Sequence, residues 1–279
     1  MDTRPMTASG AMPGPGKRNV LGVLVDATTY ASATNAVLTA ARQRRPFAVT
    51  ALAVHGVMTG VLDREHGARL NSFDLVTPDG QPVRWALNLL HGTALKDPVC
   101  GPDLTLHVLR AAADEGLPVY LYGSTEPTLD SLVLNLGNTL PALKIAGREA
   151  SRFRAAHPGE DEEIAARITE SGARLVLVGL GCPRQETFVH AMRPVLPMPL
   201  LAVGAAFDFH AGNLRRPPLW MRRRGLEWLW RLCLEPRRLW RRYVVLNPHY
   251  LLLLAAQWAR LGPAVPPAPT TDTQVAFPV

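Results

Sequence analysis

Short apolar runs alternate with helix-like segments through most of the chain, and this alternation constrains the fold more than any other feature. Predicted strands, rich in Val, Leu, Ala and Ile, lie at 19–25, 47–50, 73–76, 118–122, 143–146, 174–178 and 200–203. Predicted helices lie at 29–42, 54–63, 103–115, 125–137, 160–171 and 185–192. Apolar strands separated by helices are typical of a parallel sheet covered on both faces. The sequence therefore predicts an α/β fold, with a Rossmann-like, mostly parallel sheet and helices on both faces.

The composition changes at both ends of this alternating region. Residues 1–18 are rich in Gly, Pro, Ser and Thr and contain no apolar run like that of a signal peptide, so they are predicted to be a disordered lead. Residues 19–212 form the predicted α/β core, and residues 213–261 a basic, Trp-rich helical appendage. Residues 262–279 are predicted to be a disordered, Pro-rich tail.

The segment 215–242 concentrates the positive charge of the protein. It holds ten arginines against two glutamates, a net charge of +8, while the whole chain carries +7. Four of the six tryptophans lie in the same window. Arginine beside tryptophan suits an anionic membrane surface, because indole rings sit at headgroup depth and guanidinium groups pair with phosphate. Single-stranded nucleic acid is a rival target, and a solvated basic helix with its tryptophans in a core is a third interpretation.

The cysteines and the late apolar run indicate the cellular setting. The three cysteines are far apart, with neither an even pairing nor a CxxC spacing, which fits a reducing cytoplasm. The apolar run 250–256 is much shorter than the roughly 18 residues of a membrane span. We therefore expect any membrane contact to be peripheral, with the protein lying on one face.

Small residues follow several of the predicted strands. Parallel strands end at one edge of the sheet, so these residues are expected to gather there: Thr50, Gly123, Ser124, Gly179, Gly181 and Gly204. Glycine lets a phosphate approach backbone N–H groups, and the start of a following helix favours negative charge. A nucleotide or nucleotide-sugar site is predicted at this edge. Tight turns alone would also require glycine, so the structural interpretation stays open.

The familiar phosphate-binding and metal-binding fingerprints are missing. The sixth position of the run beginning at Gly179 is Arg184 rather than glycine, and no GxxxxGK[ST] occurs. No two aspartates are separated by one residue, so no DxD pair is present to hold a metal against a diphosphate. Asp79, between Pro78 and Gly80 after an apolar run, is the best candidate for a catalytic acid or base, although an Asp-Gly turn is the alternative. The amide of Gln185 could contact a ligand or bond to the backbone.

Five stretches together resemble a known family. They are TPDGQPVRW (77–85), LYGS (121–124), LVGLGCPRQE (177–186), AVGAAFDFHAG (202–212) and the basic segment from 215 to 243. These motifs are similar to those of the WecG/TagA/CpsF glycosyltransferase family, and the resemblance runs from about Val20 to Tyr243.

The resemblance implies a bacterial inverting hexosyltransferase that needs neither a metal nor another cofactor. The enzyme would move an N-acetylmannosamine-type sugar or related hexose from a UDP-sugar to a sugar on a polyprenyl (undecaprenyl) diphosphate. It would work peripherally at the cytoplasmic face of the inner membrane, in cell-envelope or exopolysaccharide biosynthesis. An anionic membrane surface is an expected partner and nucleic acid is not. The oligomeric state is open, because a contact between copies could cover the core when the appendage is undocked.

The resemblance also implies roles for individual residues. Asp79 matches the proposed general base, and Thr50 and Gln185 match residues that line the substrate pocket. Arg231, Arg238 and Arg241 match arginines of an appendage that closes over the donor diphosphate. Where relatives often carry an arginine, this chain has Pro98. That contact is then missing or supplied from elsewhere, for example by Arg84, which leaves the sugar identity open.

Two functions of other classes compete with transfer. A non-catalytic membrane protein that binds UDP-sugars would show binding without transfer. A nucleic-acid-binding protein would use the Arg/Trp segment and show a steep salt dependence. Against the second, the basic residues are confined to one end of the chain and the glycine-rich strand ends stay unexplained.

Overall fold

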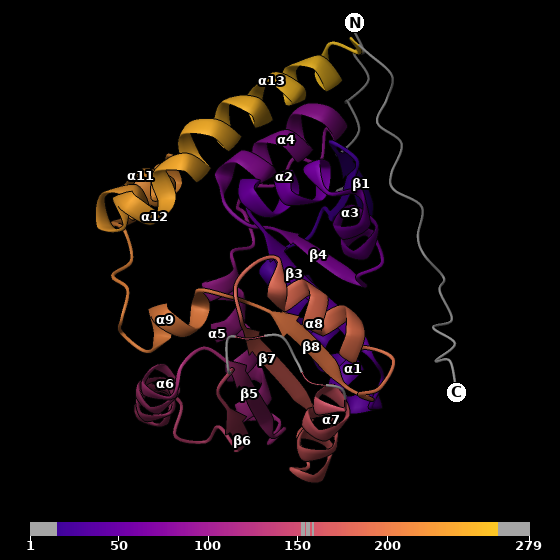
Figure 1. Cartoon of the computed structure of the whole chain (residues 1–279), viewed down its shortest axis with the longest axis vertical. Helices are drawn as coiled ribbons and strands as arrows, with labels where there is room; N and C mark the ends of the chain where they lie inside the picture. The colour runs from indigo at the N-terminus through magenta and orange to yellow at the C-terminus, as the bar shows by residue number, and fades with distance from the viewer. Residues whose placement is uncertain (1–15, 152–153, 155–156, 158, 262–279) are drawn as a thin grey trace, which may run out of the picture.

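A six-stranded parallel sheet forms the centre of the computed structural model, which describes residues 16–151, 154, 157 and 159–261 (Figure 1). The spatial order is β4-β3-β8-β7-β5-β6, and every pairing in this sheet is parallel. The strands are β3 (Phe47–Leu52), β4 (Leu75–Pro78), β5 (Val119–Gly123), β6 (Ile145–Glu149), β7 (Leu175–Gly179) and β8 (Pro199–Ala202). The predicted mixed α/β class with a mostly parallel sheet is confirmed.

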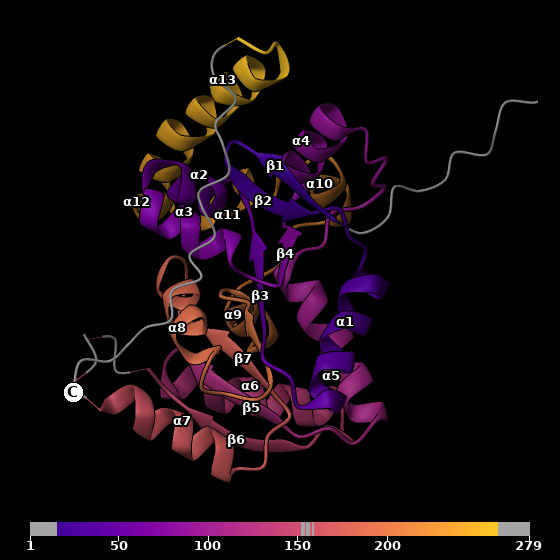
Figure 2. The same ribbon diagram turned by 90° about the vertical axis from the view of Figure 1, so that its right-hand side faces the viewer.

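Helices cover both faces of the sheet, as Figure 2 shows with α7 and α8 on one side and α1 and α5 on the other. Side chains of a strand point alternately to the two faces. Ala48 of β3 and Val176 of β7 therefore join one buried cluster, while Val49 and Leu177 join the other. The helices of the core are α1 (Tyr30–Gln43), α2 (Val54–Leu62), α3 (Arg64–Asn71), α4 (Gln81–His91), α5 (Gly101–Asp114), α6 (Glu126–Thr139), α7 (Glu160–Glu170) and α8 (Arg184–Met192).

The first predicted strand, 19–25, is wrong in its form. The structure has two short strands there, β1 (Lys17–Val20) and β2 (Val23–Asp26), paired as an antiparallel hairpin outside the main sheet. The turn falls at Leu21 and Gly22, both with positive φ, and glycine adopts this conformation without strain. The described core accordingly starts by Lys17 rather than at Asn19, while residues 1–15 lie outside the described part.

Two helices were not predicted. α3 begins directly after α2, and the side chain of Asp63 caps it by accepting a hydrogen bond from His66 N at 3.1 Å. α4 follows Gly80, with Pro82 in its first turn, where proline is well tolerated. α3 is largely polar and α4 follows a turn signal, so neither has the long apolar periodicity that predicts a helix.

Beyond β8 the chain is helical: α9 (Ala206–His210), α10 (Leu219–Arg223), α11 (Glu227–Leu234), α12 (Pro236–Arg241), the π-helical turn η1 (Arg242–Leu246) and α13 (Asn247–Trp258). α13 packs on the core through the buried Tyr250 and Leu254. Its Gln257 accepts a hydrogen bond from Leu21 N at 2.9 Å and donates to Asn19 O at 3.2 Å, joining α13 to the hairpin. No helix in the described part of the chain is long and apolar enough to cross a bilayer.

Candidate functional site

A cavity of about 750 Å³ lies where the strands of the sheet end, which is large enough for a sugar nucleotide or a similar ligand. Its walls come from the turns after β3, β4, β5, β7 and β8 and from the helices after β8. The predicted site residues on its walls are Asp79, Ser124, Gly179, Gly181, Gln185, Gly204 and Arg231. The expectation that these strand ends gather at one edge is therefore confirmed for the geometry, and their roles remain predictions.

Asp79 follows β4 and is held inside the cavity wall. Its backbone N–H donates to Leu52 O at 3.0 Å, which ties the turn after β4 to the end of β3. Burial, and after it the negative charge of Glu227, raises the pKa of the Asp79 carboxyl, which lies at about 6. Hydrogen bonds from the Cys100 thiol and the Gly101 N–H and the charge of Arg231 lower the pKa and offset part of this rise. A carboxyl with this pKa is ionised at neutral pH yet basic enough to accept a proton.

The Cys100 thiol serves Asp79 as a neutral donor. Burial raises the pKa of this thiol well above its ordinary value, with the nearby carboxylate of Asp79 acting in the same direction. The backbone N–H of Cys100 donates to the Tyr30 hydroxyl at 2.9 Å, which fixes the start of α5 beside the turn after β4. Asp79 is thus oriented by protein donors on one side and open to the cavity on the other.

Thr50 and Gln185 meet at a buried carboxylate that the sequence analysis did not single out. Thr50 Oγ1 donates to Glu186 Oε1 at 3.0 Å, and Gln185 Nε2 donates to the same oxygen at 2.9 Å. Gln185 Oε1 accepts from Gly181 N at 3.1 Å, so its amide fixes the turn after β7. Thr50 is fully buried and is not on the cavity wall, which Glu186 does line. Of the alternatives for Gln185, the bond to the backbone is the one the structure contains.

The glycines at the strand ends are needed where backbones and rings approach closely. Gly179 leaves room for the Phe207 ring, which would lie 2.6 Å from an added Cβ. Gly123 has φ +108° and would place a Cβ 2.9 Å from the backbone of Gly179, so both positions need glycine for structural reasons whatever their role toward a ligand. Gly204 would place a Cβ 2.9 Å from the Gln185 amide, so its small size lets that amide reach the turn.

The appendage contributes cations to the cavity wall. Arg222, Arg223 and Arg231 line it, and the buried Nε of Arg231 makes no hydrogen bond within the described residues. Two arginines near the start of the appendage converge on Asp103 of α5. Arg216 makes a two-pronged pair with it, at 2.6 and 2.9 Å, and Arg222 bonds to the same carboxylate. These pairs hold the pKa of Asp103 below its ordinary value, against the effect of burial.

Three arginines named from the sequence have no described contact with the cavity. Arg238 and Arg241 lie in α12, and their side chains are outside the described part of the structure. Arg84, considered as a substitute for the arginine missing at Pro98, instead donates to Leu95 O and Lys96 O at 2.8 and 2.9 Å. Both contacts brace the loop that leads to Pro98, and Arg84 is not among the residues that line the cavity, so its role as a substitute stays a prediction.

Three acidic residues at or near the cavity were missed from the sequence. Glu186 neighbours Gln185 on α8, Glu227 is one of two acids in a strongly basic run, and Asp103 lies about a hundred residues before its arginine partners. No residue pattern marks Glu186 as a site residue, because its full burial appears only in the structure. The positions of Glu227 and Asp103 at the cavity depend on contacts between distant parts of the chain.

Comparisons with known proteins agree with the geometry. The profile of the Glycosyl transferase WecG/TagA/CpsF family matches residues 18–263. An N-acetylglucosaminyldiphosphoundecaprenol N-acetyl-beta-D-mannosaminyltransferase of Bacillus subtilis is 30% identical over 195 residues, which cover 70% of this chain and 73% of that protein. A protein of the same description from Bacillus spizizenii is 30% identical over 197 residues, covering 70% and 74% of the two chains.

Proposed function

The chain belongs to the WecG/TagA/CpsF family of glycosyl transferases, and on this basis we propose that it moves a hexose from a UDP-sugar onto a polyprenyl-diphosphate-linked sugar. The sugar would be of the N-acetylmannosamine type or a related hexose, for a cell-envelope or extracellular polymer. Both relatives act, by their descriptions, on N-acetylglucosaminyldiphosphoundecaprenol, which supports an acceptor of that class.

One observation carries the proposed mechanism: a buried carboxylate and a set of arginines face the same cavity. Asp79, with its pKa raised to about 6, takes the proton of the acceptor hydroxyl as that oxygen attacks the anomeric carbon. The bond from this carbon to UDP breaks as the new bond forms on the opposite face. A single displacement of this kind inverts the configuration at the anomeric carbon.

The departing UDP accumulates negative charge on its diphosphate. Arg222, Arg223 and Arg231 supply positive charge along the cavity, and positioned donors of this kind can stabilise a transition state by about 3–4 kcal/mol each. We propose that these groups take the place of a divalent cation at the diphosphate. The absence of a DxD pair from the sequence supports this assignment.

The appendage is proposed to rest on the anionic leaflet that carries the acceptor. Twelve large hydrophobic side chains between 219 and 261 are exposed in the described part of the chain, four of them tryptophans: Leu219, Trp220, Trp228, Leu229, Leu234, Trp240, Val244, Val245, Leu251, Leu252, Trp258 and Leu261. Near-surface basic residues add about 1 kcal/mol of attraction each. This supports peripheral binding at the cytoplasmic face of the inner membrane, where the lipid-linked sugar is met.

The test is a transfer assay with purified protein, a panel of UDP-sugars and a synthetic polyprenyl-diphosphate sugar, with and without EDTA. We expect transfer from one class of UDP-hexose, with the anomeric configuration inverted and with full activity in EDTA. Binding of UDP without transfer from any donor would favour a non-catalytic UDP-sugar-binding protein. Complete loss of transfer in EDTA, restored by Mg²⁺, would contradict the proposed role of the arginines.

A further inference from the structure

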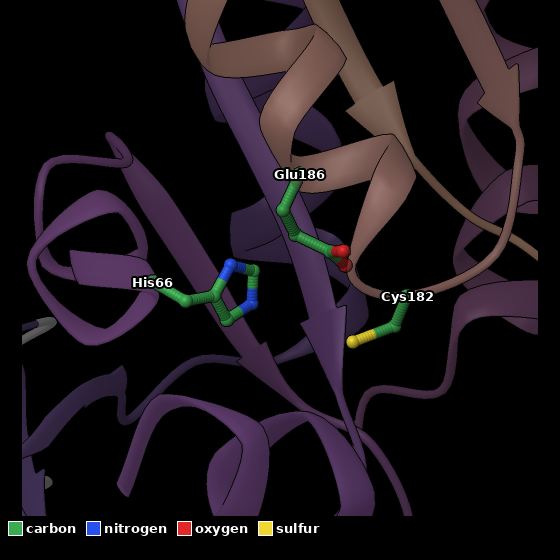
Figure 3. A group of neighbouring side chains, drawn as sticks. All are labelled: His66, Cys182 and Glu186. Atoms are coloured by element: carbon green, nitrogen blue, oxygen red, sulfur yellow. The ribbon is translucent and has the colours of Figure 1, made fainter. Parts of the chain in front are cut away.

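Three side chains with different donor atoms converge beside the cavity. His66 comes from α3, Cys182 from the turn after β7, and Glu186 from α8. One potential ligand atom from each lies within 4.8 Å of the other two. Figure 3 shows the Nε2 edge of the imidazole directed at the thiol and the carboxylate. Cys182 and Glu186 are four positions apart, but His66 comes from a distant part of the sequence, so no local motif predicts the whole cluster.

Two atoms of this cluster are buried without a partner. His66 is 1% exposed and Glu186 is 0% exposed, yet His66 Nε2 and Glu186 Oε2 make no hydrogen bond within the described residues. A buried polar atom left in this way costs about 1–3 kcal/mol. The other oxygen, Glu186 Oε1, is held by Thr50 and Gln185 at 3.0 and 2.9 Å. The carboxylate is thus oriented by its neighbours, the Cys182 thiol among them, and a metal would replace the proton between Cys182 and Glu186.

We propose that His66, Cys182 and Glu186 bind a divalent transition metal of the zinc class. Zn²⁺ accepts nitrogen, thiolate and carboxylate ligands, whereas Mg²⁺ and Ca²⁺ select oxygen ligands. Binding releases the thiol proton of Cys182 to solvent, and the imidazole ligates in its neutral form. Cys182 and Glu186 both line the cavity, so the fourth coordination position opens toward it. This site is separate from the proposed diphosphate contacts, and transfer does not require the metal.

Arg69 sets how tightly the metal is held. Arg69 NH1 lies 3.1 Å from His66 Nδ1, and a guanidinium can only donate, so without metal Nδ1 accepts and Nε2 carries the proton. A metal at Nε2 moves this proton to Nδ1, where it faces Arg69. The arginine must then turn to Glu65, to which it already donates at 2.8 Å. The metal-bound form therefore loses one contact, which lowers the affinity for the metal.

A bound ion would also act on the cavity wall. Glu186 is the shared acceptor of Thr50 and Gln185, and Gln185 fixes the turn at Gly181. A metal that draws Glu186 Oε2 toward it would move the carboxylate and so alter its hydrogen bonds with Thr50 and Gln185. Occupancy of the cluster is thereby coupled to the shape of the turn after β7.

The experiment is a titration of the metal-depleted full-length protein with Co²⁺, which reports thiolate ligation by a charge-transfer absorption in the near ultraviolet. We expect one equivalent to bind with this absorption and Zn²⁺ to displace it. Cys182→Ser should abolish the band, while His66→Gln and Glu186→Gln should weaken binding at least tenfold. Cys233→Ser, which removes an exposed thiol of the appendage, is the matched control and should leave the titration unchanged.

Arg69→Gln provides a second test, in which the affinity for the metal should rise rather than fall. Glutamine offers an acceptor to the proton on Nδ1, and an outer partner of this kind changes metal affinity by roughly tenfold or more, so binding should tighten. Thermal unfolding of each metal-free variant shows whether it is folded. Absence of the band in the folded wild-type protein overturns the proposal, as does a band that survives Cys182→Ser. His66 Nε2–H and Glu186 Oε2 would then be partners for each other.

Discussion

At the scale of single residues, the charges of Glu227 and Arg231 act on the carboxyl group of Asp79 across the cavity. Asp79 belongs to the core, whereas Glu227 and Arg231 come from the appendage. Glu227 raises the pKa of Asp79 and Arg231 lowers it. The basicity of the proposed catalytic base is therefore set partly by the segment that covers the cavity, and docking of that segment tunes the base.

Asp79→Asn tests the base directly. Asparagine keeps the size and polarity of the side chain but cannot accept the proton, so kcat should fall about 10²- to 10⁴-fold with little change in donor KM. Asp208→Asn is a matched control, because Asp208 lines the same cavity. Equal losses in the two variants, or near-normal turnover of Asp79→Asn, would remove Asp79 from this role.

Glu227→Gln tests the coupling through the pH profile. Asp79 acts in its ionised form, so with its pKa raised to about 6 the wild-type kcat/KM should fall as the pH drops through that value. Removing the charge of Glu227 lowers this pKa, and the acid limb should move to lower pH. The ratio of kcat/KM at pH 5 to that at pH 8 should rise roughly two- to fivefold. Glu235→Gln removes the same charge from the same segment and should leave the limb in place.

The site could be predicted from the sequence only where its parts lie at strand ends. The turns at Gly123, Gly179 and Gly204 follow from the topology of a parallel sheet, and Asp79 from its place after an apolar strand. The roles of Gln185 and Glu186 depend on side-chain geometry, because the same amide could serve a ligand or the backbone. The hydrogen bonds of Gln185 with Gly181 and Glu186 are visible only in three dimensions, and a ligand role for Gln185 stays a prediction.

At the scale of elements, the alternation of apolar runs with helix-like segments predicts most of the fold. The strands of the main sheet were predicted to within a few residues, because each is an apolar run bounded by turn residues. The sequence predicts a single strand where the hairpin β1–β2 lies, because the turn residues Leu21 and Gly22 fall inside an otherwise continuous apolar run. α3 is predominantly polar and directly follows α2, so no break in the sequence separates the two helices.

The start of the appendage is attached to α5 through one side chain. Asp103→Asn removes the charge that pairs with Arg216 and Arg222, and the loss of such charged hydrogen bonds should cost about 1.5–3 kcal/mol of stability. A displaced appendage also raises the KM for the donor. Thermal unfolding and steady-state kinetics measure the two effects. Asp130→Asn, which breaks an exposed pair with Arg148, should change neither by a comparable amount.

At the scale of the whole molecule, charge and exposed apolar surface are gathered at one end. The segment 215–242 carries +8, and the exposed hydrophobic side chains between 219 and 261 lie in the same helices and in α13. Apolar patches of this kind on a soluble fold mark a binding surface. The rest of the chain sums to −1, so attraction to an anionic leaflet would orient the protein with the appendage toward the lipid.

The Leu251→Ser/Leu252→Ser double variant tests this orientation. These α13 side chains are 61% and 71% exposed, so the change should leave folding intact while weakening binding to phosphatidylglycerol vesicles at least tenfold. Co-sedimentation measures the binding. The Leu134→Ser/Val195→Ser variant changes side chains of similar exposure on the core and should bind like the wild type. Stronger binding of either protein to single-stranded DNA than to vesicles would argue for a nucleic-acid partner instead.

The chain after β8 is held to the core by several contacts, and two of them lie near the two ends of this segment. One is the pairing of Arg216 with Asp103, and the other is the junction of Gln257 with the hairpin at Asn19 and Leu21. Because both ends of this segment are held, its middle can shift but the segment cannot swing away from the core as a whole. Substrate exchange would then depend on movement of α11, which has no buried residue and supplies Glu227, Trp228 and Arg231 to the cavity wall. Lipid in contact with α11 would then set the residence time of a sugar nucleotide in the cavity.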